Sequence, residues 1–410
     1  MNIGILTYHC VPNFGAQLQV LSTVECVKSL GHTPFVLNWY PKDLEEMYSH
    51  RICKEQILCH NVYTEKYLPV TSLCRTEKDL LKTISDNNID FILTGSDALF
   101  KYVPKAKRRY FSLRKFRCIT QNIISCEDFP NNPFFCDYYE KLEEKIPVVA
   151  LSVSSQNCPY KSMDKEERCL IGKSLKNFKK ITVRDEWTKE MVEFLTGISD
   201  IKVTPDPVFA FNNNCNKYIP SKDEILEKFS LSDKYVLFSF SNKYISDSYI
   251  NSVITECEER CLQPVALPMP ESLRDFGLKD TIKLPLSPID WYALIKYSCG
   301  YIGERMHPIV VCLHNSVPFY SFDEYGVIKR HLGGLVKKVN IQSSKTYHIV
   351  KKFGFLNNLY SIKSGQQPTT KEIVESLFCF DKNKCNMIAK KTSEEFISTI
   401  TELICNKCQP

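Results

Sequence analysis

The chain has 410 residues, of which 43% are hydrophobic and 24% are charged, so it can bury a large core and is not intrinsically disordered. Its 53 Lys and Arg residues against 47 Asp and Glu give a net charge of +6, too small a surplus at this length to mark a nucleic-acid-binding protein. It shows neither an apolar run of membrane-spanning length nor a secretory signal, so we expect a cytoplasmic protein whose 19 cysteines are mostly buried thiols.

The first 211 residues alternate short apolar runs with amphipathic segments, which is typical of strands and helices in a parallel α/β sheet. We expect helices at about 16–30 and 184–195, and strands at 3–8, 35–40, 89–93, 147–153, 180–183 and 201–203. Residues 1–211 are therefore expected to form an N-terminal domain.

A polar stretch at 212–232, which contains several Asn residues, is expected to link this domain to a second one. Beyond it we expect strands at 235–240, 264–267, 301–302 and 318–321, and helices at 246–262, 287–298 and 307–314. These make a second α/β domain over 233–345, followed by a helical extension over 346–410 that packs back on the N-terminal domain. Ligands bind beyond the carboxyl ends of parallel strands, so the cleft between the domains is the expected site.

The segment Gly303–Pro308 lies at a strand-to-helix turn and is rich in reactive side chains. Arg305 offers a planar, permanently charged fork for a carboxylate or phosphate, and His307 can move a proton near neutral pH. The same residues also fit a structural salt bridge and a histidine with ordinary hydrogen bonds.

Two further strand ends carry candidate residues. Arg184 follows a strand and could bind an anion, although it could equally pair with the acidic residues beside it. Asp97, after Gly95 and Ser96, could accept hydrogen bonds from sugar hydroxyls or act as a base, and it could also simply cap a helix.

A basic segment at 101–117 contains eight Lys and Arg residues, interleaved with aromatic residues and free of acidic ones. It could face anionic lipid headgroups or a diphosphate, or it could be a solvated loop. Cys405 and Cys408 form a single Cys-x-x-Cys pair without the second pair of a zinc site, so we expect ordinary cysteines and no metal. The loop after the first strand has one glycine, Gly15, which argues against a dinucleotide-binding motif.

Taken together, these motifs resemble the polysaccharide pyruvyl transferase family over roughly residues 1–330. The resemblance rests on the loop from Tyr8 to Leu18 and Gln19, on Gly95-Ser96-Asp97, on Val183 to Glu186, on Asp206-Pro207, and on Arg305-Met306-His307 followed by Pro318-Phe319. It implies two Rossmann-like domains facing a central cleft, as in GT-B glycosyltransferases, with the acceptor on the N-terminal side and the donor on the C-terminal side.

The resemblance also implies an activity. Phosphoenolpyruvate would donate its enolpyruvyl group to two hydroxyls of a sugar, most simply a galactose-like one, in a lipid-linked oligosaccharide or polysaccharide precursor. The products would be a cyclic pyruvate ketal and phosphate, in capsule or cell-surface polysaccharide biosynthesis. No cofactor or metal is required, and contact with the anionic inner face of the plasma membrane would be peripheral.

The resemblance assigns donor binding to Arg184 and Arg305, proton transfer to His307, and an acceptor-side role to Asp97. To these we add candidate acceptor contacts at Asn13, Ser96, Arg108 and Arg109. Two other functions stay open: a GT-B glycosyltransferase that uses a nucleotide sugar, and a non-catalytic binding homologue.

Overall fold

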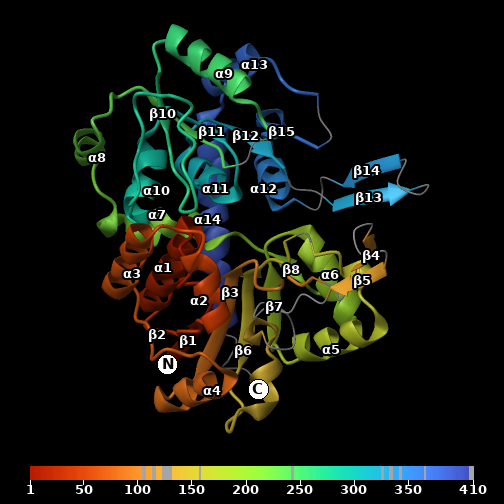
Figure 1. Cartoon of the computed structure of the whole chain (residues 1–410). Coiled ribbons are helices and arrows are strands. Elements are labelled where there is room, and N and C mark those ends of the chain that lie inside the picture. The colour runs from red at the N-terminus through yellow and green to blue at the C-terminus, as the bar shows by residue number, and fades with distance from the viewer. Residues whose placement is uncertain are drawn as a thin grey trace.

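The computed structural model describes residues 1–103, 108–112, 117–121, 132–156, 158–241, 244–324, 327–331, 336–340, 344–363 and 366–405. It contains two parallel sheets, one above the other in Figure 1, and this confirms the expected α/β class. The first sheet has the order β2-β1-β3-β6-β7-β8, and its strands are β1 (Asn2–Leu6), β2 (Thr33–Val36), β3 (Phe91–Asp97), β6 (Val148–Val153), β7 (Lys180–Val183) and β8 (Lys202–Val203).

The second sheet has the order β10-β9-β11-β12-β15. Its strands are β9 (Tyr235–Ser239), β10 (Gln263–Ala266), β11 (Gly300–Gly303), β12 (Phe319–Asp323) and β15 (Leu359–Ser361). The inner strands of both sheets are apolar and wholly buried, because helices cover both faces.

Two helices with clear N-terminal caps begin near the positions that the sequence predicts. Asn13 caps α1 by accepting a hydrogen bond from the amide of Ala16, and Ser287 followed by Pro288 starts α10. The helices are α1 (Phe14–Ser29), α2 (Lys42–Ser49), α3 (Lys54–Tyr67), α4 (Glu77–Asp86), α5 (Lys165–Leu175), α6 (Glu186–Thr196), α7 (Phe211–Cys215), α8 (Lys222–Phe229), α9 (Asp247–Glu259), α10 (Pro288–Tyr297), α11 (Met306–Asn315), α12 (Lys345–Phe353), α13 (Thr370–Phe378) and α14 (Lys382–Cys405).

Three regions differ from the expectations. The stretch expected as a linker at 212–232 holds helix α8 and most of α7. The basic segment, for which a solvated loop was one expectation, instead contains β4 (Arg108–Ser112) and the start of β5 (Arg117–Gln121), which pair as antiparallel strands. A second antiparallel pair, which the sequence did not predict, consists of β13 (Val327–His331) and β14 (Val336–Asn340). The extension expected to be helical from residue 346 also supplies β15, the edge strand of the second sheet.

The two halves share one apolar core. It joins α1 of the first half to α10 and α11 of the second, and it includes Phe14, Trp291 and Val311. Helix α14 runs from the second half down along the first, and its Ile404 belongs to the same core (Figure 1). This shared core fixes the carboxyl ends of the two sheets relative to each other, which is where the site lies.

Candidate active site

A pocket of about 190 Å³ lies beside the point in each sheet where the order of the strands reverses. In the first sheet the reversal falls between β1 and β3, and in the second between β9 and β11. Such switch points open a crevice beyond the carboxyl ends of the strands. The loops that follow β1 and β11 supply Asn13 and Arg305 to the pocket wall, and the last residue of β3 supplies Asp97, so residues distant in sequence meet at one place.

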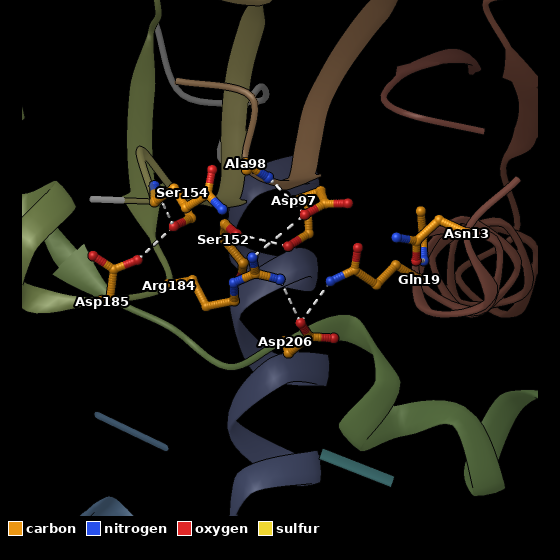
Figure 2. Close-up of polar contacts among 12 residues, drawn as sticks. Asn13, Gln19, Asp97, Ala98, Ser152, Ser154, Arg184, Asp185 and Asp206 are labelled. Carbon is orange, nitrogen blue, oxygen red and sulfur yellow. Dashed lines mark hydrogen bonds and ion pairs between the residues drawn. The ribbon is translucent and has the colours of Figure 1, made fainter. Parts of the chain in front are cut away.

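Arg184 lies behind this pocket as the centre of a buried ion cluster (Figure 2). Its Nη1 is 2.6 Å from Oδ2 of Asp206, and its Nη2 is 3.5 Å from Oδ1 of Asp97. Gln19 of α1 donates a further hydrogen bond of 2.5 Å to Asp206. Burial alone would lower the pKa of Arg184, but the carboxylates of Asp206 and Asp97 raise it above its ordinary value. The cluster ties β3, β7 and α1 together.

Asp97 ends β3 and faces the pocket in an unusual backbone conformation, with a φ of 107°. The amide of Ala98 donates to its Oδ1 at 2.7 Å. Burial would raise the pKa of Asp97, but Lys345 and Arg184 outweigh burial and hold the pKa below its usual value. Asp97 is therefore a carboxylate at neutral pH, ready to accept hydrogen bonds.

His307 lies in the first turn of α11 on the opposite wall. Its ring packs directly against Gly15, since a Cβ atom on residue 15 would come within 2.0 Å of the imidazole Cγ. Nε2 has no hydrogen-bond partner among the residues that the structure describes. Burial lowers the pKa of His307 to about 4, more than the carboxylates of Asp206 and Asp97 raise it. The imidazole is thus neutral at pH 7.

Two basic residues from the second half also line the pocket. Arg305 has a positive φ of 76°, donates from Nη2 to Oγ of Ser241 at 3.2 Å, and lines the pocket. Lys345 is the first residue of α12, after the cap Ser344. Burial and the neighbouring Arg184 lower the pKa of Lys345 to about 8, so its ammonium is present at neutral pH but easily lost.

The structure brings together Asp97, Asn13, Arg305 and His307, as the sequence predicts. Ser96 is not part of the pocket wall, because its hydroxyl is buried and donates to the carbonyl of Ser152 at 2.7 Å. The side chains of Arg108 and Arg109 lie outside the described residues, as does Cys408.

Arg184 lines a separate cavity of about 440 Å³, so its expected contact with a donor stays a prediction. Lys345 was missed because it comes 38 residues after His307, with no motif around it. The sequence indicates Asp206 and Gln19 only as parts of the family pattern and predicts no role for either residue.

The pocket is thus lined by the acidic residues Asp97 and Glu271, a neutral imidazole, and the basic residues Arg305, Lys345 and Lys101. Such a set can bind an anionic molecule and move protons on it. Within the described ranges, no group of three or more His, Cys, Asp or Glu side chains is arranged to hold a metal ion. None of the helices described is both long and apolar enough to cross a bilayer.

The sequence matches a family model described as polysaccharide pyruvyl transferase over residues 13–324. The chain belongs to the polysaccharide pyruvyl transferase family. Membership confirms the resemblance and makes this family member a transferase of polysaccharide biosynthesis. The match spans α1, Asp97, Arg184, Asp206, Arg305 and His307, whereas Lys345 lies beyond its end. No curated protein matches the chain.

Solved structures share the fold of this pyruvyl transferase family member at low identity. The UDP-GlcNAc 2-epimerase from Neisseria meningitidis matches with a TM-score of 0.56 and 13% identity, over 99% of this chain and 100% of the other. The epimerase from Methanocaldococcus jannaschii gives 0.54 and 10%, over 96% and 100%. UGT89C1 from Arabidopsis thaliana gives 0.52 and 10%, over 98% and 99%. These similarities establish the GT-B-like arrangement of two Rossmann-like domains and nothing about substrates.

Proposed function

We propose that this protein transfers the enolpyruvyl group of phosphoenolpyruvate onto two hydroxyls of a sugar and releases phosphate. The observation that carries the proposal is the convergence of Asp97 and His307 from opposite halves on one pocket, beside the cations of Arg305 and Lys345. The sugar is expected to be galactose-like and part of a lipid-linked polysaccharide precursor, as in capsule biosynthesis.

The donor carries a carboxylate and a phosphate, so its binding needs at least two positive groups. Arg305 can hold one anionic group with its planar fork, and Lys345 can act on the other as a point charge. Both lie at the N-terminal ends of helices, α11 and α12, whose exposed amides also favour anions. Arg184 already pairs with two carboxylates of the chain, so we assign it to positioning Asp97 instead.

Each of the two reacting hydroxyls loses a proton. One proton is balanced by the proton that the methylene carbon of the donor gains, and the other leaves with the phosphate. The central carbon gains two bonds to sugar oxygens, and it loses its double bond and its bond to the phosphate oxygen. His307 is neutral at pH 7 and can accept a hydroxyl proton. The negative charge of the bound donor raises the pKa of His307, which allows it to carry and return that proton.

Asp97 is placed to orient the acceptor. As an ionised carboxylate on the wall opposite His307, it can accept hydrogen bonds from one or both reacting hydroxyls. Asn13 lies on the same wall, and because its side-chain oxygen caps α1, its amide nitrogen is the group left to donate to the sugar. The basic hairpin of β4 and β5 is expected to meet the lipid diphosphate or anionic lipid at the inner membrane face. Reversing Arg108 and Arg109 to Glu should then weaken binding to anionic vesicles, and unchanged binding would remove the hairpin from the proposal.

The deciding assay measures phosphate release from phosphoenolpyruvate across a panel of lipid-linked glycans. We expect release with at least one galactose-containing acceptor, and a loss of about 10²- to 10⁴-fold in His307→Gln. An exposed control, Lys82→Gln on α4, should keep the rate. Near-normal release by His307→Gln would refute the role of His307.

The alternative is a glycosyltransferase that uses a nucleotide sugar, the kind of ligand named for the structurally similar epimerases. Thermal stability discriminates the two functions, because a ligand that binds the folded protein raises its melting temperature. We expect a shift with phosphoenolpyruvate and none with UDP-sugars. The reverse result would favour the glycosyltransferase.

A further inference from the structure

Trp291 lines the pocket and carries a buried hydrogen-bond donor that the described part of the chain does not use. Its side chain is fully buried on α10 and forms part of the pocket wall, yet its Nε1 has no hydrogen-bond partner among the described residues. Buried donors are nearly always paired, because leaving one unpaired costs free energy. Trp187 shows the ordinary arrangement: its Nε1 donates to the carbonyl of Cys158 at 2.9 Å.

The indole cannot turn away to find another partner. Its ring stacks on Phe14, with centroids 5.2 Å apart and planes 23° from parallel. Phe14 is the first residue of α1, and the next residue, Gly15, packs against the ring of His307. On its own helix Trp291 lies in the turn that Ser287 caps. The stacking therefore holds the indole ring in place in the wall of the pocket.

We propose that the Nε1–H of Trp291 donates a hydrogen bond to an anionic oxygen of the donor substrate, which makes it a binding residue of the phosphoenolpyruvate site. The inference rests on the function proposed above. The donor is the favoured recipient because Trp291 lies in the same half of the chain as Arg305, His307 and Lys345. An ionised oxygen also forms a stronger hydrogen bond than a sugar hydroxyl. Unlike the cations that line the same pocket, the indole adds no charge, so it favours a substrate whose oxygen lies along the direction of its N–H bond.

Binding can be followed without the acceptor. The chain has three tryptophans, and the double variant Trp39→Phe/Trp187→Phe leaves Trp291 as the single indole fluorophore. Titration of this variant with phosphoenolpyruvate should change its emission to saturation. Separate titrations with inorganic phosphate and with pyruvate show whether the hydrogen bond serves the phosphate or the carboxylate oxygen.

Affinity is compared by isothermal titration calorimetry in two variants. Replacement of Trp291 by 3-benzothienylalanine keeps the shape of the ring but removes the N–H, and Trp291→Phe tests a smaller ring. We expect the dissociation constant for phosphoenolpyruvate to rise about 10- to 100-fold in both. The melting temperature of the unliganded benzothienyl variant should equal that of the wild type. Trp187→Phe, outside the pocket, is the matched control and should bind as the wild type does.

The outcomes separate the two proposals. If the wild type binds phosphoenolpyruvate and the benzothienyl variant binds it equally well, the role of Trp291 is refuted and the proposed function stands. If the wild type does not bind phosphoenolpyruvate at all, the proposed function fails, and the inference fails with it.

Discussion

Gly15 of α1 and His307 of α11 are in direct contact across the junction of the two halves. A Cβ atom on residue 15 would lie 2.0 Å from Cγ and 2.2 Å from Nδ1 of the imidazole, where no real Cβ fits. The ring of His307 is thus positioned by a residue nearly 300 positions earlier in the chain. The contact explains why the first turn of α1 needs a glycine at this position.

The first prediction follows from this contact. Gly15→Ala should displace the imidazole and reduce phosphate release at least 10²-fold, because misplacement of a reacting group by about 1 Å costs that much. The shared core should stay folded, which circular dichroism can check. Gly31→Asn is the control, since Gly31 has a φ of 79° with no atom near its Cβ position, and Asn tolerates that conformation. Equal activity of Gly15→Ala and the control would contradict the positioning role.

The second prediction concerns acid stability. The pKa of His307 is lowered from 6.5 to about 4 in the folded protein, so between these values the unfolded chain holds a proton that the folded one lacks. Stability contributed by the neutral ring is therefore complete above pH 6.5 and is lost as the pH falls toward 4. Urea unfolding at pH 7 and pH 4.5 should show a smaller acid loss in His307→Gln than in the wild type. The same loss in both proteins would mean that the ring titrates normally.

The third prediction concerns alkaline activity. The pKa of Lys345 is lowered to about 8, so its ammonium is lost in the folded protein as the pH rises above that value. If this charge binds the donor, kcat/KM for phosphoenolpyruvate should fall above pH 8. Lys345→Arg keeps its charge, and its profile should stay flat to at least pH 9 even where its maximum is lower. An unchanged alkaline limb in the variant would assign the fall to another group.

The fourth prediction concerns the ion cluster behind the pocket. Arg184→Gln leaves the carboxylates of Asp97 and Asp206 buried without their main cation, so we expect the free energy of unfolding to drop by about 3–5 kcal/mol. Chemical denaturation measures the drop. Lys82→Gln, which breaks the exposed ion pair with Asp86, is the matched control and should cost far less. A similar cost for both substitutions would argue against a structural role of Arg184.

Much of the fold could be predicted because local patterns agree with it. The apolar runs of β3, β6 and β9 are buried on both faces, and Ser287-Pro288 marks the start of α10 within one residue. The site at the strand ends follows from the same pattern, since parallel strands place their carboxyl ends together. This is why the sequence predicts that Asp97, Arg305 and His307 line the same cleft.

The rest depends on contacts that no local pattern encodes. No local pattern shows that the guanidinium of Arg184 pairs with Asp206, which comes 22 residues later. Lys345 lines the pocket as the first residue of α12, beyond the paired strands β13 and β14, and no local pattern connects it with His307. The sequence around β4 and β5 does not indicate strands, because a run of charged and aromatic residues is equally typical of a solvated loop.

Asp97 and Arg305 both adopt backbone conformations that glycine holds more easily, one on each wall of the pocket. Residues kept in such conformations cost of order 1–3 kcal/mol each. A directed-evolution screen for heat resistance alone would therefore tend to enrich Gly or Asn at these two positions, and the more thermostable proteins that it selects would lack activity. Libraries aimed at a robust biocatalyst should keep both positions constant.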